Sequence, residues 1–236
     1  MMKWLDNIRI WIFGRTEEEK CKLGAKLLDA AASGDTNAAK ALLEQGAAAD
    51  FMKGPLHVAC AKGHPGVVKL LLEHGADINA RDGENIQPIH CAAQGGSVEV
   101  LDLLVAAGAD IHAVSHSGWV PLLVAAQYGR VEMVKALFDW RVDIHGANEW
   151  GCGALYIAAS HDQLQMVKFL LERGVDPMVH NNDGKTPRDI AKSDDVRKAI
   201  DDFLKKSDAD AVRDALQNRA AHVRRVLAGR SPVPRL

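Results

Sequence analysis

The amino-acid sequence predicts an all-α fold, a solenoid of stacked helix–turn–helix units, because three residue types recur every 33 positions. Proline recurs on this grid, with alanine once in its place: Pro55, Pro88, Pro121, Ala154 and Pro187. Glycine recurs with one arginine exception: Gly75, Gly108, Arg141 and Gly174. Aspartate follows two positions later in each unit: Asp77, Asp110, Asp143 and Asp176. A period of this length is typical of an array of short structural repeats.

Each repeat is predicted to contain two short helices. The grid proline suits the first turn of a helix, where its missing N–H would be unpaired in any case. Small residues such as Ala92 and Ala93 follow, and they let neighbouring helices pack closely. After a glycine turn, the second helix carries an apolar stripe, as in Val67 to Leu72. The grid glycine is then expected to end this helix in the left-handed conformation.

Two segments, Gly54-Pro-Leu-His-Val-Ala and Gln87-Pro-Ile-His-Cys-Ala, resemble the Thr-Pro-Leu-His-x-Ala motif of ankyrin repeats. Gly75-Ala-Asp-Ile-Asn-Ala matches the end of the same repeat, and the likeness runs from about Leu27 to Leu204. The resemblance implies an ankyrin-repeat solenoid of about six units with short β-hairpin fingers, flanked by extra terminal helices. Where the family has a turn glycine, Asn85 is expected to take the left-handed conformation.

The expected organisation has three parts. Residues 1–15 form an N-terminal amphipathic segment, residues 16–206 the repeat domain, and residues 207–236 a C-terminal helix with a basic tail. Repeat boundaries are expected near 16–50, 51–82, 83–115, 116–148, 149–181 and 182–206. Thr16 and Glu19 have the spacing of a capping box, which predicts a helix start there. Because Gly46 lies only 29 residues before Gly75, the first finger is predicted to be short.

The two ends of the chain have alternative interpretations. Trp4 and Trp11 share one face of a predicted N-terminal helix, which either caps the first repeat or docks on a membrane surface or a partner. The C-terminal arginines belong either to a solvated helix face or to a contact with phosphate or an acidic protein. These cations are Arg219, Arg224, Arg225, Arg230 and Arg235.

Composition and spacing argue against several other classes of protein. The formal net charge of −2 gives no global attraction to nucleic acid, and no apolar run reaches the ~18 residues of a membrane-spanning helix. The four cysteines lack the spacing of a zinc site, so neither a metal nor a cofactor is expected. No nucleophile with a nearby base, phosphate-binding loop or carboxylate pair is apparent, which predicts a non-enzyme without a small-molecule substrate.

The resemblance also indicates which positions folding leaves free, on the fingers and on the exposed side of each first helix. Aromatic residues are only 5% of the chain, yet Trp119, Tyr128 and Trp150 all fall at such positions. Because Trp and Tyr often dominate binding energy, they are the predicted binding centre; the alternative is that they pack along the fingers between adjacent repeats. The other predicted partner-binding residues are Arg81, Glu84, Ile86, His116, Gln127, Glu149, His161 and Lys185.

The sequence therefore predicts a cytoplasmic protein-binding module that is monomeric when free and binds a protein partner on its concave face. An adaptor, an effector delivered into a host cell and an inhibitor of the immunity type all fit this class. The competing prediction is a scaffold that associates with a membrane or nucleic acid through the N-terminal tryptophans or the C-terminal arginines.

Overall fold

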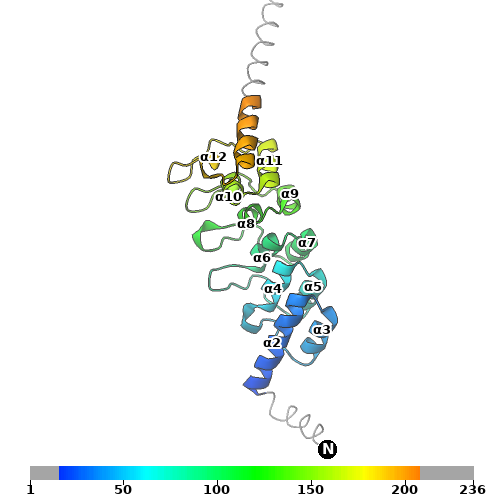
Figure 1. Ribbon diagram of the computed structural model, residues 1–236. Helices are drawn as coiled ribbons and strands as arrows, with labels where there is room; N and C mark the ends of the chain where they lie inside the picture. The colour runs from blue at the N-terminus through cyan, green and yellow to red at the C-terminus, as the bar shows by residue number, and fades with distance from the viewer. Residues whose placement is uncertain (1–15, 208–236) are drawn as a thin grey trace, which may run out of the picture.

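The computed structural model describes residues 16–207, which form a stack of helix pairs (Figure 1). Segments 1–15 and 208–236, with Trp4, Trp11 and the five C-terminal arginines, lie outside the described residues, so both interpretations of each end stay predictions. Within residues 16–207 no strand is present, and a single antiparallel bridge joins Ala147 to Gly153. The all-α class is confirmed, and the predicted hairpin fingers are loops with almost no strand pairing.

The helices form an inner and an outer layer, and each repeat contributes one helix to each layer. The inner helices are α2 (Glu17–Ser33), α4 (Pro55–Lys62), α6 (Pro88–Gly95), α8 (Pro121–Gln127), α10 (Ala154–Ser160) and α12 (Pro187–Ile190). The outer helices are α3 (Thr36–Glu44), α5 (Pro65–Glu73), α7 (Val98–Ala106), α9 (Val131–Asp139), α11 (Leu164–Glu172) and a helix over residues 194–207. Consecutive inner helices pack together, as do consecutive outer helices from α3 to α11.

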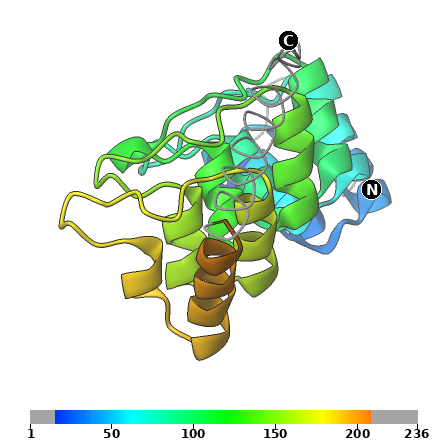
Figure 2. The same ribbon diagram turned by 90° about the horizontal axis from the view of Figure 1, so that it is seen from above.

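Long loops connect each outer helix to the next inner helix and project to one side of the stack, as Figure 2 shows along its axis. We number these loops as fingers 1 to 5: residues 45–54, 74–87, 107–120, 140–153 and 173–186. Finger 1 contains the short helix η1 (Phe51–Lys53), and finger 3 contains η2 (His116–Gly118). Finger 1 is shorter than the others, as predicted. The ring of Phe51 packs on Gly24 of α2, where a Cβ would lie 2.2 Å from it.

Helices begin and end at the residues that the sequence indicates. Grid prolines occupy the first turn of α4, α6, α8 and α12. Thr16 and Glu19 form the predicted capping box before α2, with distances of 3.0 and 3.2 Å between backbone nitrogen and side-chain oxygen. Gly75, Gly108 and Gly174 follow the outer helices with φ of 82°, 95° and 81°. The left-handed ends of the outer helices are therefore confirmed.

The core lies between the two layers and continues through the whole stack. Leu101 and Leu104 of α7 are fully buried against α6, whose Ala92 and Ala93 are fully buried as well. A Cβ at Gly95 would lie 2.7 Å from the carbonyl oxygen of Ala61. Because such contacts are too short, small residues on the inner helices set how closely successive repeats stack.

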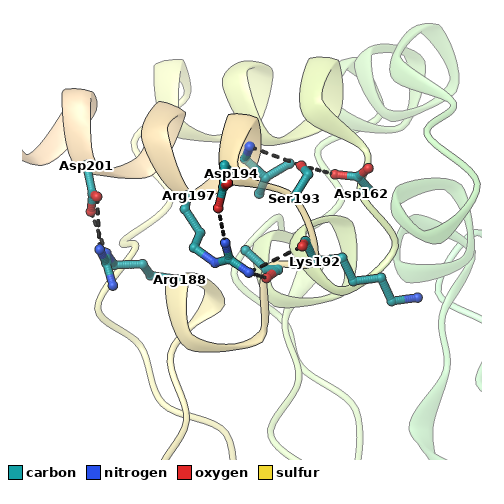
Figure 3. A network of polar contacts seen from close by, with 9 residues as sticks. Asp162, Arg188, Lys192, Ser193, Asp194, Arg197 and Asp201 are labelled. Atoms are coloured by element: carbon teal, nitrogen blue, oxygen red, sulfur yellow. Dashed lines mark hydrogen bonds and ion pairs between the residues drawn. The ribbon is translucent and has the colours of Figure 1, made fainter.

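Polar contacts hold the last repeat together and join it to the one before it (Figure 3). On the helix over residues 194–207, Asp201 accepts a hydrogen bond from Arg188 of α12, with 3.0 Å between Nη2 and Oδ2. Arg197 donates to two backbone carbonyls after α12, at 3.0 and 3.2 Å. The hydroxyl of Ser193 donates to Asp162, which lies in the turn between α10 and α11. The end of the array is thus held by side chains as well as by apolar packing.

Arg141 breaks the glycine grid but still adopts the left-handed conformation, with φ of 60°. Because this conformation costs a residue with a Cβ roughly 1–2 kcal/mol, Arg141→Gly is expected to raise the free energy of unfolding by about 0.5–1 kcal/mol in urea denaturation. Gly108→Ala is the reverse control, because a Cβ there meets no atom within 4 Å. It should lower the free energy of unfolding by a similar amount. If neither substitution changes the free energy of unfolding, the left-handed backbone does not affect stability at these positions.

Candidate partner-binding groove

Fingers 2 to 5 each turn around a short polar residue that recurs on the 33-residue grid. In finger 2, Oδ1 of Asp82 accepts two backbone N–H groups, at 2.8 and 2.9 Å. Asn148 and Asn181 accept pairs of backbone N–H groups in the same way in fingers 4 and 5. Ser115 stands at this place in finger 3. The recurrence is visible in the sequence as a fourth series on the 33-residue grid.

Backbone hydrogen bonds join the tips of neighbouring fingers. Fingers 3, 4 and 5 each donate one tip N–H to a carbonyl of the finger before it. The bonds run from His116 to Glu84, from Glu149 to Ser117 and from Asn182 to Trp150, with lengths of 3.1, 3.2 and 2.9 Å. Fingers 2 to 5 therefore form one continuous wall, and the backbone of each tip residue has a fixed position.

The two motif histidines tie the inner helices to this wall. Nε2 of His57 donates to the Ile86 carbonyl at 3.1 Å, and Nε2 of His90 donates to the Trp119 carbonyl at 3.2 Å. Nδ1 of His90 accepts the N–H of Gln87 at 3.2 Å. Burial lowers the pKa of His90, although these hydrogen bonds oppose the shift. His90 is therefore a neutral scaffold residue, as the sequence predicts.

The lowered pKa of His90 makes the stability of the fold depend on pH. Below the ordinary histidine pKa of about 6.5, the unfolded chain binds a proton that the folded chain resists. The stabilisation is thus present above about pH 6.5 and is lost as the pH falls through the lowered pKa. His90→Leu, which copies Leu123 of the next repeat, should flatten the fall in unfolding free energy between about pH 7 and pH 5. If the unfolding free energies of the wild type and His90→Leu fall in parallel with pH, His90 is not the source of the pH dependence.

A groove of about 530 Å³ opens between fingers 2 to 4 and the inner helices α6 and α8; we call it the finger groove. Seven of the predicted partner-binding residues line it: Glu84, Ile86, His116, Trp119, Gln127, Tyr128 and Trp150. Gln94 and Ser117 also line it, at positions of the repeat that folding leaves free, and the sequence did not indicate the remaining lining residues: Asp82, His90, Cys91, Ser115 and Val124. The fold thus brings most of the predicted residues into one concave site.

The other four predicted residues lie outside the lining of the finger groove. Arg81 is held within finger 2 by a 2.6 Å hydrogen bond to a side-chain amide. Glu149 and Lys185 are exposed on fingers 4 and 5. His161 is exposed at the edge of the site, with Nε2 3.2 Å from Nε2 of Gln127. A partner that extends beyond the groove would meet these residues only at its periphery.

The three aromatic residues of the predicted binding centre differ in their packing. Tyr128 and Trp150 are 41% and 51% exposed. Trp119 is half-buried and packs against the core, and its carbonyl accepts the hydrogen bond from His90. The expectation that folding leaves Trp119 free is corrected, because its ring covers the core beside the fingers. Its contact with a partner stays a prediction.

The chemistry that the finger groove offers is apolar contact, hydrogen bonding and negative charge. Cys91 lines it, but burial, together with the charge of Asp82, raises the pKa of this thiol to about 12. It is therefore protonated and a poor nucleophile at neutral pH. Within residues 16–207, no group of three His, Cys, Asp or Glu side chains is placed to hold a metal ion. No helix in this range is both long and apolar enough to cross a membrane.

A one-dimensional stack of helix pairs with a wall of fingers and a concave groove defines a solenoid repeat protein. The chain belongs to the ankyrin repeat family. The family described as "Ankyrin repeats (3 copies)" matches residues 89–181 and 122–213, which together are more than half of the chain. The related family "Ankyrin repeats (many copies)" matches residues 56–105. Ankyrin repeats are protein-binding modules, so the coarse functional class predicted from the sequence holds.

Similar curated proteins share only short segments with this chain. Zygote-specific protein 3 of Chlamydomonas reinhardtii is 49% identical over 59 residues, 24% of this chain and 16% of that protein. The probable E3 ubiquitin-protein ligase XBOS33 of Oryza sativa subsp. japonica is 46% identical over 65 residues, 25% of this chain and 12% of that protein. Ankyrin repeat and SOCS box protein 16 of Mus musculus is 37% identical over 90 residues, 37% and 19% of the two chains. The chain thus spans less than a fifth of each relative.

Proposed function

We propose that this chain is a non-catalytic module that captures a protein partner in the finger groove. The observation that carries the proposal is the convergence of two exposed aromatic residues, Tyr128 and Trp150, on a groove whose walls are already fixed by the fold. Aromatic side chains bury a large area and lose little conformational entropy on binding, which is why they dominate many interfaces. Packing of the repeats does not require an aromatic residue at either of these exposed positions.

Trp150 is presented by a backbone that is held from both sides. Its N–H donates to Oδ1 of Asn148 at 3.1 Å, and its carbonyl accepts the N–H of Asn182 at 2.9 Å. A partner that contacts the ring therefore does not have to order the loop that carries it. Such preorganisation increases affinity because less freedom is lost on association.

The chemistry of the groove supports a binding role over a catalytic one. The only thiol among the lining residues stays protonated, and both ring nitrogens of His90 are engaged in hydrogen bonds. We propose a cytoplasmic location because all four cysteines are free thiols. The identity of the partner decides among the three roles: a toxin indicates an inhibitor, a host protein an effector, and a protein of the same cell an adaptor.

Affinity purification with the full chain tests this proposal, with two tryptophan variants as a matched pair. Trp150 and Trp140 are 51% and 50% exposed, but Trp140 lies at the start of finger 4, directly after α9, and does not line the finger groove. The wild type and Trp140→Ala should capture the same protein, and Trp150→Ala should lose it. Equal capture by both variants would contradict binding in the groove.

A further inference from the structure

The finger groove is acidic on one side and aromatic on the other. Asp82 and Glu84 line it from finger 2, while Tyr128 and Trp150 line it from the end of α8 and from finger 4. No lysine or arginine is among its lining residues. Within residues 16–207, neither carboxylate forms an ion pair, and the neighbouring Arg81 is held by another finger residue. The charge of the two carboxylates is therefore available to a ligand.

The charge of Asp82 acts inside the groove and not only at its rim. It contributes to the raised pKa of Cys91 on α6, after burial, and it opposes the burial effect on the pKa of His90. Both groups come from α6, one of the two inner helices that line the groove. Oδ1 of Asp82 is occupied by two backbone N–H groups, which leaves Oδ2 without a hydrogen bond in the described structure.

We propose, building on the proposed function, that the finger groove receives an arginine or lysine side chain of the protein partner, carried on a segment with apolar neighbours. The cationic head would lie between the carboxylates of finger 2 and the faces of the aromatic rings, which both attract cations. Its aliphatic stem would pack on Ile86 and Val124, two apolar residues of the lining. An acidic segment would meet like charge and is excluded.

Selection from a library of random displayed peptides against the full chain tests the chemistry of the occupant. The selected peptides should be enriched in one basic residue beside apolar residues, and Trp150→Ala should abolish their binding. In synthetic copies, replacing arginine by citrulline removes the charge and keeps the length of the side chain, whereas acetylation of lysine removes the charge and adds an acetyl group. This change should weaken binding about tenfold, and the effect should shrink between about 0.05 and about 0.5 M salt.

Two conservative variants test the role of the carboxylates. Asp82→Asn keeps a side-chain oxygen that can accept the two backbone N–H groups of the turn, since Asn148 and Asn181 fill the same place in fingers 4 and 5. Combined with Glu84→Gln, it should weaken the binding of the basic peptides about tenfold and leave the binding of their neutral copies unchanged. Glu73→Gln is the control, because Glu73 is an exposed carboxylate at the end of α5, outside the groove.

The outcomes separate this inference from the function on which it rests. One contrary result is that the selected peptides depend on Trp150 but lack a basic residue; another is that they bind the two finger-2 variants as tightly as the wild type. Either result overturns the proposal of a cationic side chain in the groove but leaves groove binding intact. A selection that yields no peptide sensitive to Trp150→Ala contradicts groove binding itself, and the cationic occupant falls with it.

Discussion

Replacing Leu104 with alanine is expected to lower the free energy of unfolding by roughly 2–5 kcal/mol. Leu104 is fully buried in α7, in the middle of the array, and its side chain belongs to the core between the two layers. The truncation removes buried apolar surface and leaves a cavity that the tightly stacked helices can fill only in part. Urea denaturation followed by circular dichroism measures the effect.

Leu103→Ala is the matched control for this large effect. Leu103 precedes Leu104 on the same helix but is only partly buried, so the substitution has the same helix propensity change and a smaller packing loss. Its cost should stay near 1 kcal/mol. Because each repeat contacts only its neighbours, Leu104→Ala should also broaden the transition as the two halves of the array uncouple. Equal costs for the two variants would show that the core does not run through α7.

Combining Tyr128→Ala with Trp150→Ala is expected to weaken partner binding by about 100-fold or more, because truncation of a central aromatic residue often costs ~2 kcal/mol. Both residues are more than a third exposed and do not belong to the buried core. The free energy of unfolding should therefore change by less than about 1 kcal/mol. Isothermal titration calorimetry with the purified partner measures the affinity, and urea denaturation measures the stability.

Trp140→Ala and Trp119→Ala are the comparison variants for this double substitution. Trp140→Ala removes an equally exposed tryptophan outside the finger groove and should leave affinity unchanged. Trp119→Ala should reduce stability as well as binding, because the ring packs against the core. Unchanged affinity in the Tyr128 and Trp150 double variant, or a loss explained by unfolding, would remove the aromatic pair from the interface.

The repeat fold was predictable because several fixed backbone requirements leave a mark on the sequence every 33 residues. Proline marks the first turn of an inner helix, and glycine marks the left-handed end of an outer helix. At Arg141 the mark is missing, yet φ is 60°, since the neighbouring repeats impose the same backbone. A single exception on such a grid therefore does not interrupt the array.

The candidate site was predictable only in part. Tyr128 and Trp150 follow from their places on exposed positions of the repeat. The burial of Trp119 depends on how its side chain packs beside the finger, which position in the repeat does not determine. The acidic side of the groove was predictable only in part: Glu84 is among the predicted residues, whereas Asp82 belongs to a grid position that the prediction does not use. The wall is held by backbone hydrogen bonds between fingers, which leave no side-chain pattern, and by the side-chain amides of Asn85 and Asn182, which donate to carbonyls of the neighbouring fingers.

Hydrogen–deuterium exchange of the full chain, with and without its partner, tests the central claim most directly. Binding in the finger groove should slow amide exchange in fingers 2 to 4 and leave the outer helices α5, α7 and α9 unchanged. The tip amides of His116 and Glu149 lie in this wall and serve as its reporters. Slowed exchange in the outer helices, with none in the fingers, would contradict the proposed site.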